Sequence, residues 1–165
     1  MLINLKEIKK KIILKNNIYS LLIILIVFFL DRYTKIFILN NFNESTFYLN
    51  EFVNFDLVWN TGIGFGLLSF KTENIYNFIT IIIGLVIFIL LFICLTSTKI
   101  DKIAFSMICG GALGNFYDRM VYKAVPDFID LHLENFHWFT FNLADIFITL
   151  GILIYLIRGI LIKEV

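Results

Sequence analysis

The fold is decided by residues 74–97, which read NIYNFITIIIGLVIFILLFICLTS. This stretch contains no charged side chain, and its residues are almost all aliphatic or aromatic. A helix needs about 20 mostly apolar residues to cross the hydrocarbon core of a bilayer. Residues 74–97 are therefore predicted to form one membrane-spanning helix.

Three further stretches have the length of a membrane span and carry only a few polar side chains: residues 18–40, 103–121 and 141–162. The composition also indicates a lipid environment, because 59% of the 165 residues are hydrophobic and 16% are charged. Soluble domains contain about 25% charged residues. We expect a single integral membrane domain over residues 1–165, an all-α protein with four transmembrane helices.

The basic residues predict the orientation of the chain, because lysine and arginine concentrate in cytoplasmic segments of membrane proteins. With the N-terminus inside, most of them fall on the cytoplasmic side, and both termini are predicted to be cytoplasmic. The net charge of +1 argues against nucleic acid as a partner. The basic residues assigned to the cytoplasmic side are Lys6, Lys9, Lys10, Lys11, Lys15, Lys99, Lys102, Arg158 and Lys163.

Two longer segments, residues 41–73 and 122–140, are then expected on the extracytoplasmic side of the membrane. In the first, apolar and polar residues alternate from Val53 to Asn60, which is the period of a β-strand. The second is rich in Phe, His and Trp, a composition typical of the membrane interface. We predict a strand in the first segment and an interfacial loop in the second.

Polar side chains in three of the predicted spans lie at a similar depth, toward the outer face. A polar group inside hydrocarbon costs a few kcal/mol on insertion scales, so each one calls for a reason. Residues three or four apart share a helix face, and such pairs recur in all three spans. Gly110 and Gly114 form a small-xxx-small pattern that lets a neighbouring helix approach closely. The polar residues concerned are Asp31, Lys35, Asn115, Asp118, Arg119, Asn142 and Asp145.

Most of these acids also have a purely structural interpretation. Asp31 and Lys35, four residues apart, are interpreted as an internal ion pair. Asp118 beside Arg119 is interpreted as a positioning or interfacial charge pair. In the outer segment, Asp127 and Asp130 are by default solvated surface acids.

Asp145 is harder to explain structurally, because it has no basic neighbour in sequence and an isolated charge there is costly. If a second acid lies nearby, the two carboxyls hold one proton between them, so one takes a proton from water while the other polarises a carbonyl. The residues alone thus indicate an intramembrane acid site. A small proton-coupled transporter subunit and a non-catalytic assembly protein are the alternatives, although we find no internal repeat of the kind transporters carry.

Metal and cofactor chemistry is not expected from this sequence. His132 and His137, with Glu134 between them, do not have the spacing of ligands on one helix face. The chain contains no HExxH, GxSxG or glycine-rich phosphate motif. Cys94 and Cys109 lie in apolar runs and are predicted to be buried thiols.

Five short motifs, spread over roughly residues 25–150, occur together and in a fixed order. Read together, they resemble the lipoprotein signal peptidase (signal peptidase II) family, and five ordered matches make the resemblance very specific. The motifs are DRYTK at 31–35, NTGIGFG at 60–66, GGALGNFYDR at 110–119, VPDFID at 125–130 and FNLAD at 141–145.

The resemblance implies a four-span aspartic peptidase of the bacterial cytoplasmic (inner) membrane, with its site toward the outer face. Such enzymes remove the signal peptide from prolipoproteins, before a cysteine that carries diacylglycerol. The segment 41–70 would form an outer β-cradle over the substrate. The implied partners are the prolipoprotein and membrane lipids; we expect a monomer without cofactor.

The resemblance also assigns roles to individual residues. Asp127 and Asp145 would be the catalytic pair, and Asp31, Lys35 and Asp118 would support the site. The residues implied to line the substrate site are Asn115, Arg119, Asn142, Asn60 and Gly62.

Two positions need comment within this resemblance. Gly64 stands where the family often has alanine, which is expected to loosen the turn. Pro126 directly precedes Asp127 and is expected to stiffen its approach, because proline fixes its own φ and biases Val125 toward an extended conformation.

Overall fold

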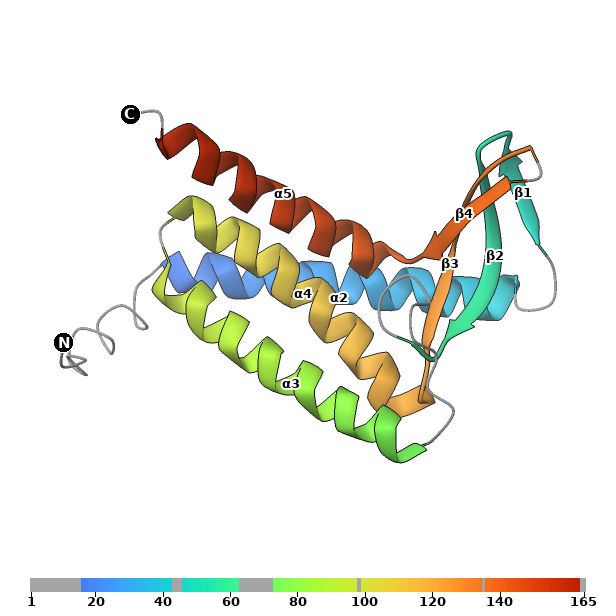
Figure 1. The fold of residues 1–165 in the computed structure, drawn as a ribbon, viewed down its shortest axis with the longest axis horizontal. Helices are drawn as coiled ribbons and strands as arrows, with labels where there is room; N and C mark the ends of the chain where they lie inside the picture. The colour runs from blue at the N-terminus through green and yellow to red at the C-terminus, as the bar shows by residue number, and fades with distance from the viewer. Residues whose placement is uncertain (1–15, 43–45, 63–72, 98, 135, 164–165) are drawn as a thin grey trace.

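The computed structural model describes residues 16–42, 46–62, 73–97, 99–134 and 136–163. In this part of the chain, long helices form a bundle with a small sheet at one end (Figure 1). The elements are α2 (Asn16–Asn41), β1 (Phe47–Asn50), β2 (Val53–Asn60), α3 (Glu73–Thr96), α4 (Lys99–Tyr122), β3 (Val125–Leu133), β4 (Phe136–Phe141) and α5 (Leu143–Lys163).

Two helices are long and apolar enough to cross a membrane, namely α3 over Glu73–Thr96 and α5 over Leu143–Leu161. In the most apolar stretch of each helix, only 17% of the residues of α3 and 11% of those of α5 are buried. A core helix of a soluble protein would hide such side chains, so these exposed apolar surfaces are suited to lipid. α2 and α4 are similarly long but interrupt their apolar runs with charged residues, and their crossing of the membrane stays a prediction.

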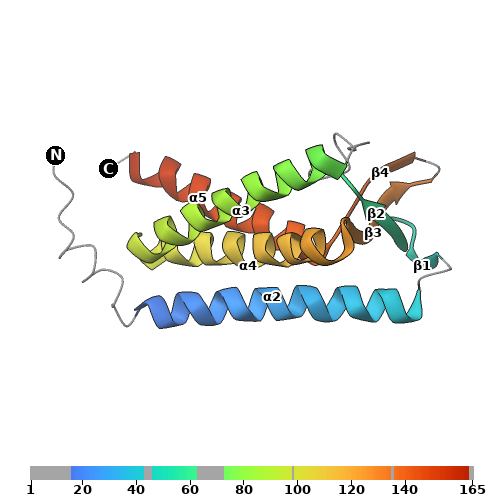
Figure 2. The same ribbon diagram turned by 90° about the horizontal axis from the view of Figure 1, so that it is seen from below.

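α4 lies at the centre of the bundle and packs against α2, α3 and α5 (Figure 2). Glycines allow the close approach. A methyl group on Gly110 would lie 2.7 Å from Cβ of Val27 in α2, and one on Gly114 would collide with the Asp31 carboxylate. On another side of α4, a methyl group on Gly111 would lie 2.5 Å from the backbone oxygen of Ala144 in α5. The predicted packing role of Gly110 and Gly114 is confirmed.

The sheet is antiparallel with strand order β1-β2-β3-β4. The strand predicted from the alternation of residues 53–60 is confirmed as β2. The loop predicted for residues 122–140 is wrong, because this segment supplies β3 and most of β4, and its position at the membrane interface stays a prediction. The turn between these two strands is made with Glu134 at a φ of 54°.

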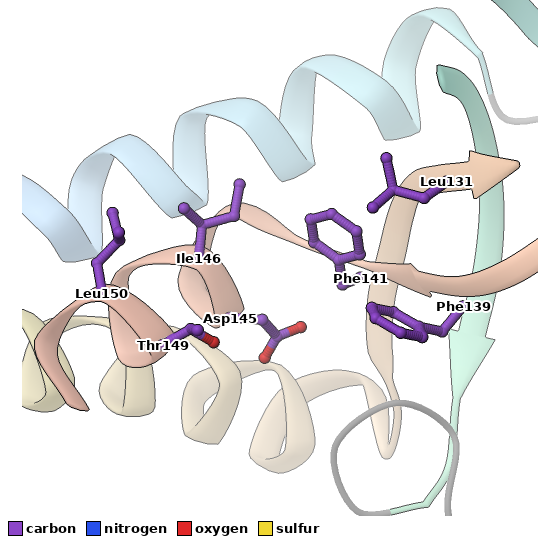
Figure 3. A pocket seen from close by; sticks show the side chains of 7 residues that line it. All are labelled: Leu131, Phe139, Phe141, Asp145, Ile146, Thr149 and Leu150. Carbon is purple, nitrogen blue, oxygen red and sulfur yellow. The ribbon is translucent and has the colours of Figure 1, made fainter. Parts of the chain in front are cut away.

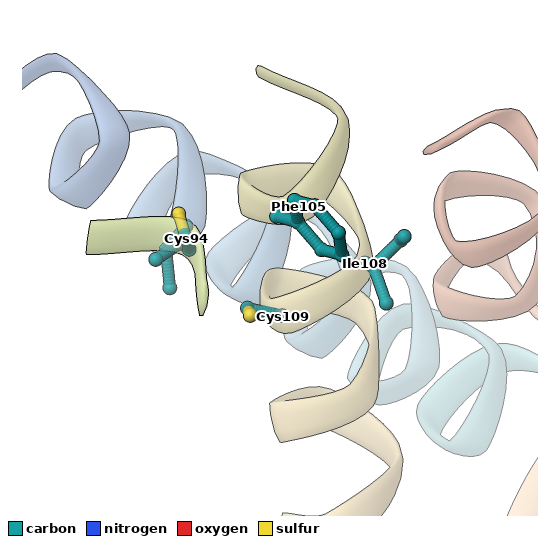
Figure 4. Close-up of a cluster of buried hydrophobic side chains, with 5 residues drawn as sticks. Cys94, Phe105, Ile108 and Cys109 are labelled. Carbon is teal, nitrogen blue, oxygen red and sulfur yellow. The ribbon is translucent and has the colours of Figure 1, made fainter. Parts of the chain in front are cut away.

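An apolar cluster lies in the helix bundle and includes both cysteines (Figure 4). Cys94 and Cys109 are free thiols, 1% and 0% exposed, which confirms the prediction of buried thiols. They pack with Ile24, Phe105 and Ile108.

Some sequence predictions lie outside the described residues. They concern the basic residues before Asn16, Lys71, and the part of the glycine-rich motif that includes Gly64 and Gly66.

The glycine contacts predict which glycines tolerate a side chain. In α5, a methyl group on Gly151 would lie 2.7 Å from the backbone oxygen of Ala104, whereas one on Gly159 would meet nothing within 4 Å. We expect Gly151→Ala to lower the free energy of unfolding by about 1–3 kcal/mol, as overpacking does. Gly159→Ala, in the same helix, is the matched control and should leave stability unchanged or slightly higher. Thermal unfolding in detergent micelles measures both, and equal effects would contradict the packing described.

Candidate active site

The candidate site lies where the sheet meets the helix bundle, and Asn142 is at its centre. Asn142 directly precedes α5, and its Oδ1 accepts the backbone N–H of Asp145 at 3.2 Å. In return, Oδ2 of Asp145 accepts the backbone N–H of Asn142 at 3.2 Å. This reciprocal pair is a capping box, which satisfies N–H groups that a helix start leaves without partners. The cap therefore holds the Asp145 carboxyl at the first turn of α5.

The same asparagine also binds the second acid of the predicted pair. Because Oδ1 of Asn142 faces Asp145, its amide NH2 points away and donates to Oδ1 of Asp127 at 2.5 Å. Asp127 lies in β3 and is 2% exposed, so the default of a solvated surface acid is wrong for this residue. One side chain thus brings together Asp127 and Asp145, which are 18 positions apart in sequence.

The end of β2 contributes the next contact. Asn60 donates from its NH2 to Oδ2 of Asp127 at 2.8 Å, and its Oδ1 accepts the backbone N–H of Gly62 at 2.8 Å. Arg119 of α4 donates to the backbone oxygen of Gly62 at 2.8 Å. Both oxygens of Asp127 therefore accept an amide N–H, and Gly62 is tied to the helix bundle.

A buried charge cluster lies behind the acids. Lys35 is 0% exposed and donates to Asp31 at 2.8 Å and to Asp118 at 2.7 Å, and Asp118 also pairs with Arg32. The predicted ion pair of Asp31 and Lys35 is confirmed. The predicted pairing of Asp118 with Arg119 is wrong, because α4 turns these neighbours to different partners.

The charge cluster reaches the candidate site along two routes. Lys35 donates to Oδ1 of Asn115 at 2.8 Å, and the NH2 of Asn115 donates to Oδ1 of Asp145 at 2.8 Å. Asp31 accepts the backbone N–H of Ala144 at 3.1 Å. A carboxylate at the start of a helix stabilises it, because the N–H groups there carry partial positive charge.

Burial and, as a smaller cause, the negative charge of nearby Asp145 raise the pKa of Asp127 to about 6. Hydrogen bonds from Asn60 and Asn142 oppose this shift, because they favour the carboxylate. The carboxyl of Asp127 therefore holds a proton in mildly acidic solution, where an ordinary aspartate would be ionised.

An apolar pocket of about 250 Å³ opens beside Asp145 (Figure 3). Asp145 supplies its charged group, and the other side chains come from β3, β4 and α5. Such a pocket suits an apolar side chain held next to a carboxyl. The remaining lining residues are Leu131, Phe139, Phe141, Ile146, Thr149 and Leu150.

Asp130 lies in the same strand as Asp127 but has different partners. It is 4% exposed, so the prediction of a solvated acid is wrong here as well. Its carboxylate lies 2.7 Å from Nδ1 of His137 on β4, and the rings of His132 and His137 stack at 5.4 Å. Asp130 therefore belongs to a separate cluster on the β3–β4 hairpin.

Sequence reasoning missed two parts of this site. The role of Asn142 as a helix cap could have been found, because Asn142 and Asp145 have the spacing of a capping box. The contacts of Arg32 with Asp118 and of Asp31 with Ala144 join different helices, and no local spacing indicates them.

Comparison with known proteins gives consistent matches. The profile of the signal peptidase (SPase) II family matches residues 23–161. A lipoprotein signal peptidase of Pelagibacter ubique (strain HTCC1062) is 54% identical over 145 residues, covering 86% of this chain and 87% of that protein. A lipoprotein signal peptidase of Anaplasma marginale (strain Florida) is 35% identical over 146 residues, covering 87% of this chain and 85% of that protein.

Two solved structures share the fold. One, a bacterial membrane enzyme determined by the in meso method at 2.3 Å resolution, has a TM-score of 0.74 and 29% identity, covering 88% of each chain. The other, described in the same words at 1.9 Å resolution, has a TM-score of 0.72 and 29% identity, covering 85% of this chain and 91% of that chain. The resemblance predicted from the five motifs is confirmed, and this chain belongs to the signal peptidase II family.

Proposed function

We propose that this protein is a membrane aspartic endopeptidase that removes the signal peptide from prolipoproteins, cutting before a cysteine that carries diacylglycerol. Membership of the signal peptidase II family supports a protease that processes lipoprotein precursors. The observation that carries the aspartic mechanism is the bonding of Asn142 to both Asp127 and Asp145.

In this mechanism, the two carboxyls hold one proton between them, since two nearby carboxylates do not easily both ionise. The ionised carboxyl takes a proton from water as the water oxygen bonds to the scissile carbonyl carbon. The protonated carboxyl gives its proton to the carbonyl oxygen. When the C–N bond breaks, the leaving nitrogen takes the proton that came from water, and one hydroxyl of the tetrahedral carbon returns its proton to the other carboxylate. The pair again holds one proton, and the acid and amine products separate.

The neighbouring residues would hold the pair and the substrate. Asn60, Asn115 and Asn142 are hydrogen-bond donors that orient the two carboxyls. We assign Arg119 and Gly62, which bind each other, to holding the end of β2 beside the two carboxyls. An apolar side chain of the signal peptide would occupy the pocket beside Asp145.

We place the enzyme in the bacterial cytoplasmic membrane, with four spans, both termini inside and the site at the outer face. α2 begins and α5 ends at the end of the bundle opposite the sheet, which supports termini on one side (Figure 1). The apolar, exposed surfaces of α3 and α5 support contact with lipid. The monomer would suffice, because one chain supplies both acids, and the proposed chemistry requires no cofactor.

Replacing either acid of the pair tests the mechanism. We expect Asp127→Asn and Asp145→Asn each to lower cleavage of a diacylated prolipoprotein by at least about a hundredfold, because general acid–base catalysis is lost. Asp130→Asn is the matched control, since Asp130 is a buried acid of the same strand bound to His137 instead. It should keep most of the activity. Wild-type cleavage by either pair variant, in reconstituted membranes, would reject the mechanism.

The pH dependence of cleavage follows from the raised pKa of Asp127. Below a pH of about 6 its carboxyl is protonated, and as the pH rises through that value the pair loses its shared proton. We therefore expect kcat/KM to fall on the alkaline side, with a midpoint near the pKa of Asp127. A peptide substrate without titratable side chains, assayed in detergent micelles, isolates this effect. Activity that stays constant into alkaline solution would place the proton elsewhere.

A further inference from the structure

Three asparagines surround the proposed catalytic pair. In each of them, a hydrogen bond to the side-chain oxygen fixes the orientation of the amide. Oδ1 of Asn60 accepts the N–H of Gly62, and Oδ1 of Asn142 accepts the N–H of Asp145. Oδ1 of Asn115 accepts a hydrogen bond from the ammonium of Lys35. An amide has its acceptor and its donors at opposite corners, so in all three residues the NH2 must face a carboxyl of the pair.

Asn115 differs from the other two because its partner carries a charge. The Lys35 ammonium binds Asp31, Asp118 and Asn115, at 2.7–2.8 Å, so all three of its N–H donors are used. If the Asn115 amide turned over, its NH2 would face the ammonium, and a buried donor of Lys35 would lose its acceptor. That arrangement costs about 1–3 kcal/mol or more, since the donor is charged.

We propose that Lys35 is a positioning residue that acts through Asn115 to make Asp145 the ionised member of the pair. This inference rests on the proposed peptidase function and adds a division of roles to it. Asp145 would then take the proton from water, and Asp127 would hold the proton given to the carbonyl oxygen.

Lys35 acts on Asp145 through a directed hydrogen-bond chain, because the cluster around it carries no net charge. The cluster behind Asn115 contains two cations, Lys35 and Arg32, and two anions, Asp31 and Asp118, which balance each other. What reaches Asp145 is the polarised amide of Asn115, because a chain of hydrogen bonds strengthens each member. A donor backed by an ammonium stabilises a carboxylate more than a neutral donor does.

The groups that face Asp145 come from every element around it. α2 contributes Lys35, α4 contributes Asn115 and Arg119, and the backbone N–H of Asn142 donates from the start of α5. Asp145 also interacts with the charge of Asp127 in β3, while Asp31 of α2 binds the backbone N–H of the adjacent Ala144. Arg119 carries a positive charge, but it also influences Asp127, so it does not by itself distinguish the two acids. Of the two acids, only Asp145 is reached by the hydrogen-bond chain that runs from Lys35 through Asn115.

The surroundings of Asp127 agree with its holding the proton. Its two donors, Asn60 and Asn142, are both backed by neutral backbone N–H groups. The raised pKa of Asp127 arises from burial and from the negative charge on Asp145. Asp145 is the more accessible of the two and lines the apolar pocket.

The experiment measures kcat/KM against pH for the parent, Lys35→Met, Asn115→Leu and the double variant. The substrate is a diacylated peptide without titratable side chains, in detergent micelles. Each single change breaks the hydrogen-bond chain from the Lys35 ammonium that favours the Asp145 carboxylate. The acidic limb of the profile, where kcat/KM falls as Asp145 becomes protonated, should therefore move to higher pH by about one unit. The double variant should move no further, because both changes break the same chain. The alkaline limb should move less than the acidic limb, because the charge of Lys35 also lowers the pKa of Asp127 but reaches it without a hydrogen-bond chain.

Asp118→Asn is the matched control. It removes a charge from the same cluster but leaves the contact from Lys35 to Asn115, so it should lower thermal stability without moving the acidic limb upward. Lower kcat at every pH with unmoved limbs in Lys35→Met and Asn115→Leu would overturn the inference and leave Lys35 a structural role. If Lys35→Met does not fold, Lys35→Gln replaces it, because this side chain keeps neutral donors while removing the charge behind Asn115; an unmoved acidic limb in that variant overturns the inference.

The outcomes separate this inference from the function on which it rests. A parent protein that cleaves the diacylated peptide, with acidic limbs identical in parent and variants, rejects only the role of Lys35. A folded parent protein without any cleavage rejects the peptidase function, and the inference with it.

Discussion

The ammonium of Lys35 is bound by Asp31, Asp118 and Asn115 in a place without solvent exposure. A buried ion pair adds little net stability, but removing one partner costs about 3–5 kcal/mol, because the other charge is left alone. The C-terminal half of α2 is therefore fixed against α4 at one register. From this point, contacts run to the first turn of α5 through Asp31 and through Asn115. The geometry of the candidate site depends on that register.

Small residues make this arrangement possible. α4 carries its glycines toward both neighbours: Gly114 lies against Asp31 of α2, and Gly111 lies against the backbone of Ala144 in α5. Larger residues would move α5 away from α4, and the amide of Asn115 would no longer reach Asp145. In lipid, where apolar surface gives no drive for helices to associate, close backbone packing and buried polar contacts supply the association.

The sequence predicted the helices and β2 but not the second hairpin, and the reason is physical. Apolar and polar residues alternate in the sequence over residues 53–60, and this period of two indicates β2. Residues 125–128 are buried on both faces, and residues 136–139 are exposed on both, so neither shows a period of two. The five motifs identified the family and singled out residues that the structure brings together around Asn142. Their mutual contacts depend on helix packing, which no spacing within one motif encodes.

The capping box at Asn142 has a consequence for how the enzyme comes into being. The cap of α5 can form as soon as that helix does, because Asn142 and Asp145 are near in sequence. Asp127 joins them only when β3 has paired with β2 and its neighbours, on the far side of the bilayer from the ribosome in the proposed topology. A newly inserted chain would hold one half of its reactive pair until its translocated hairpins assemble. Proteolytic competence would thus be acquired last in biogenesis, after the membrane-embedded part is in place.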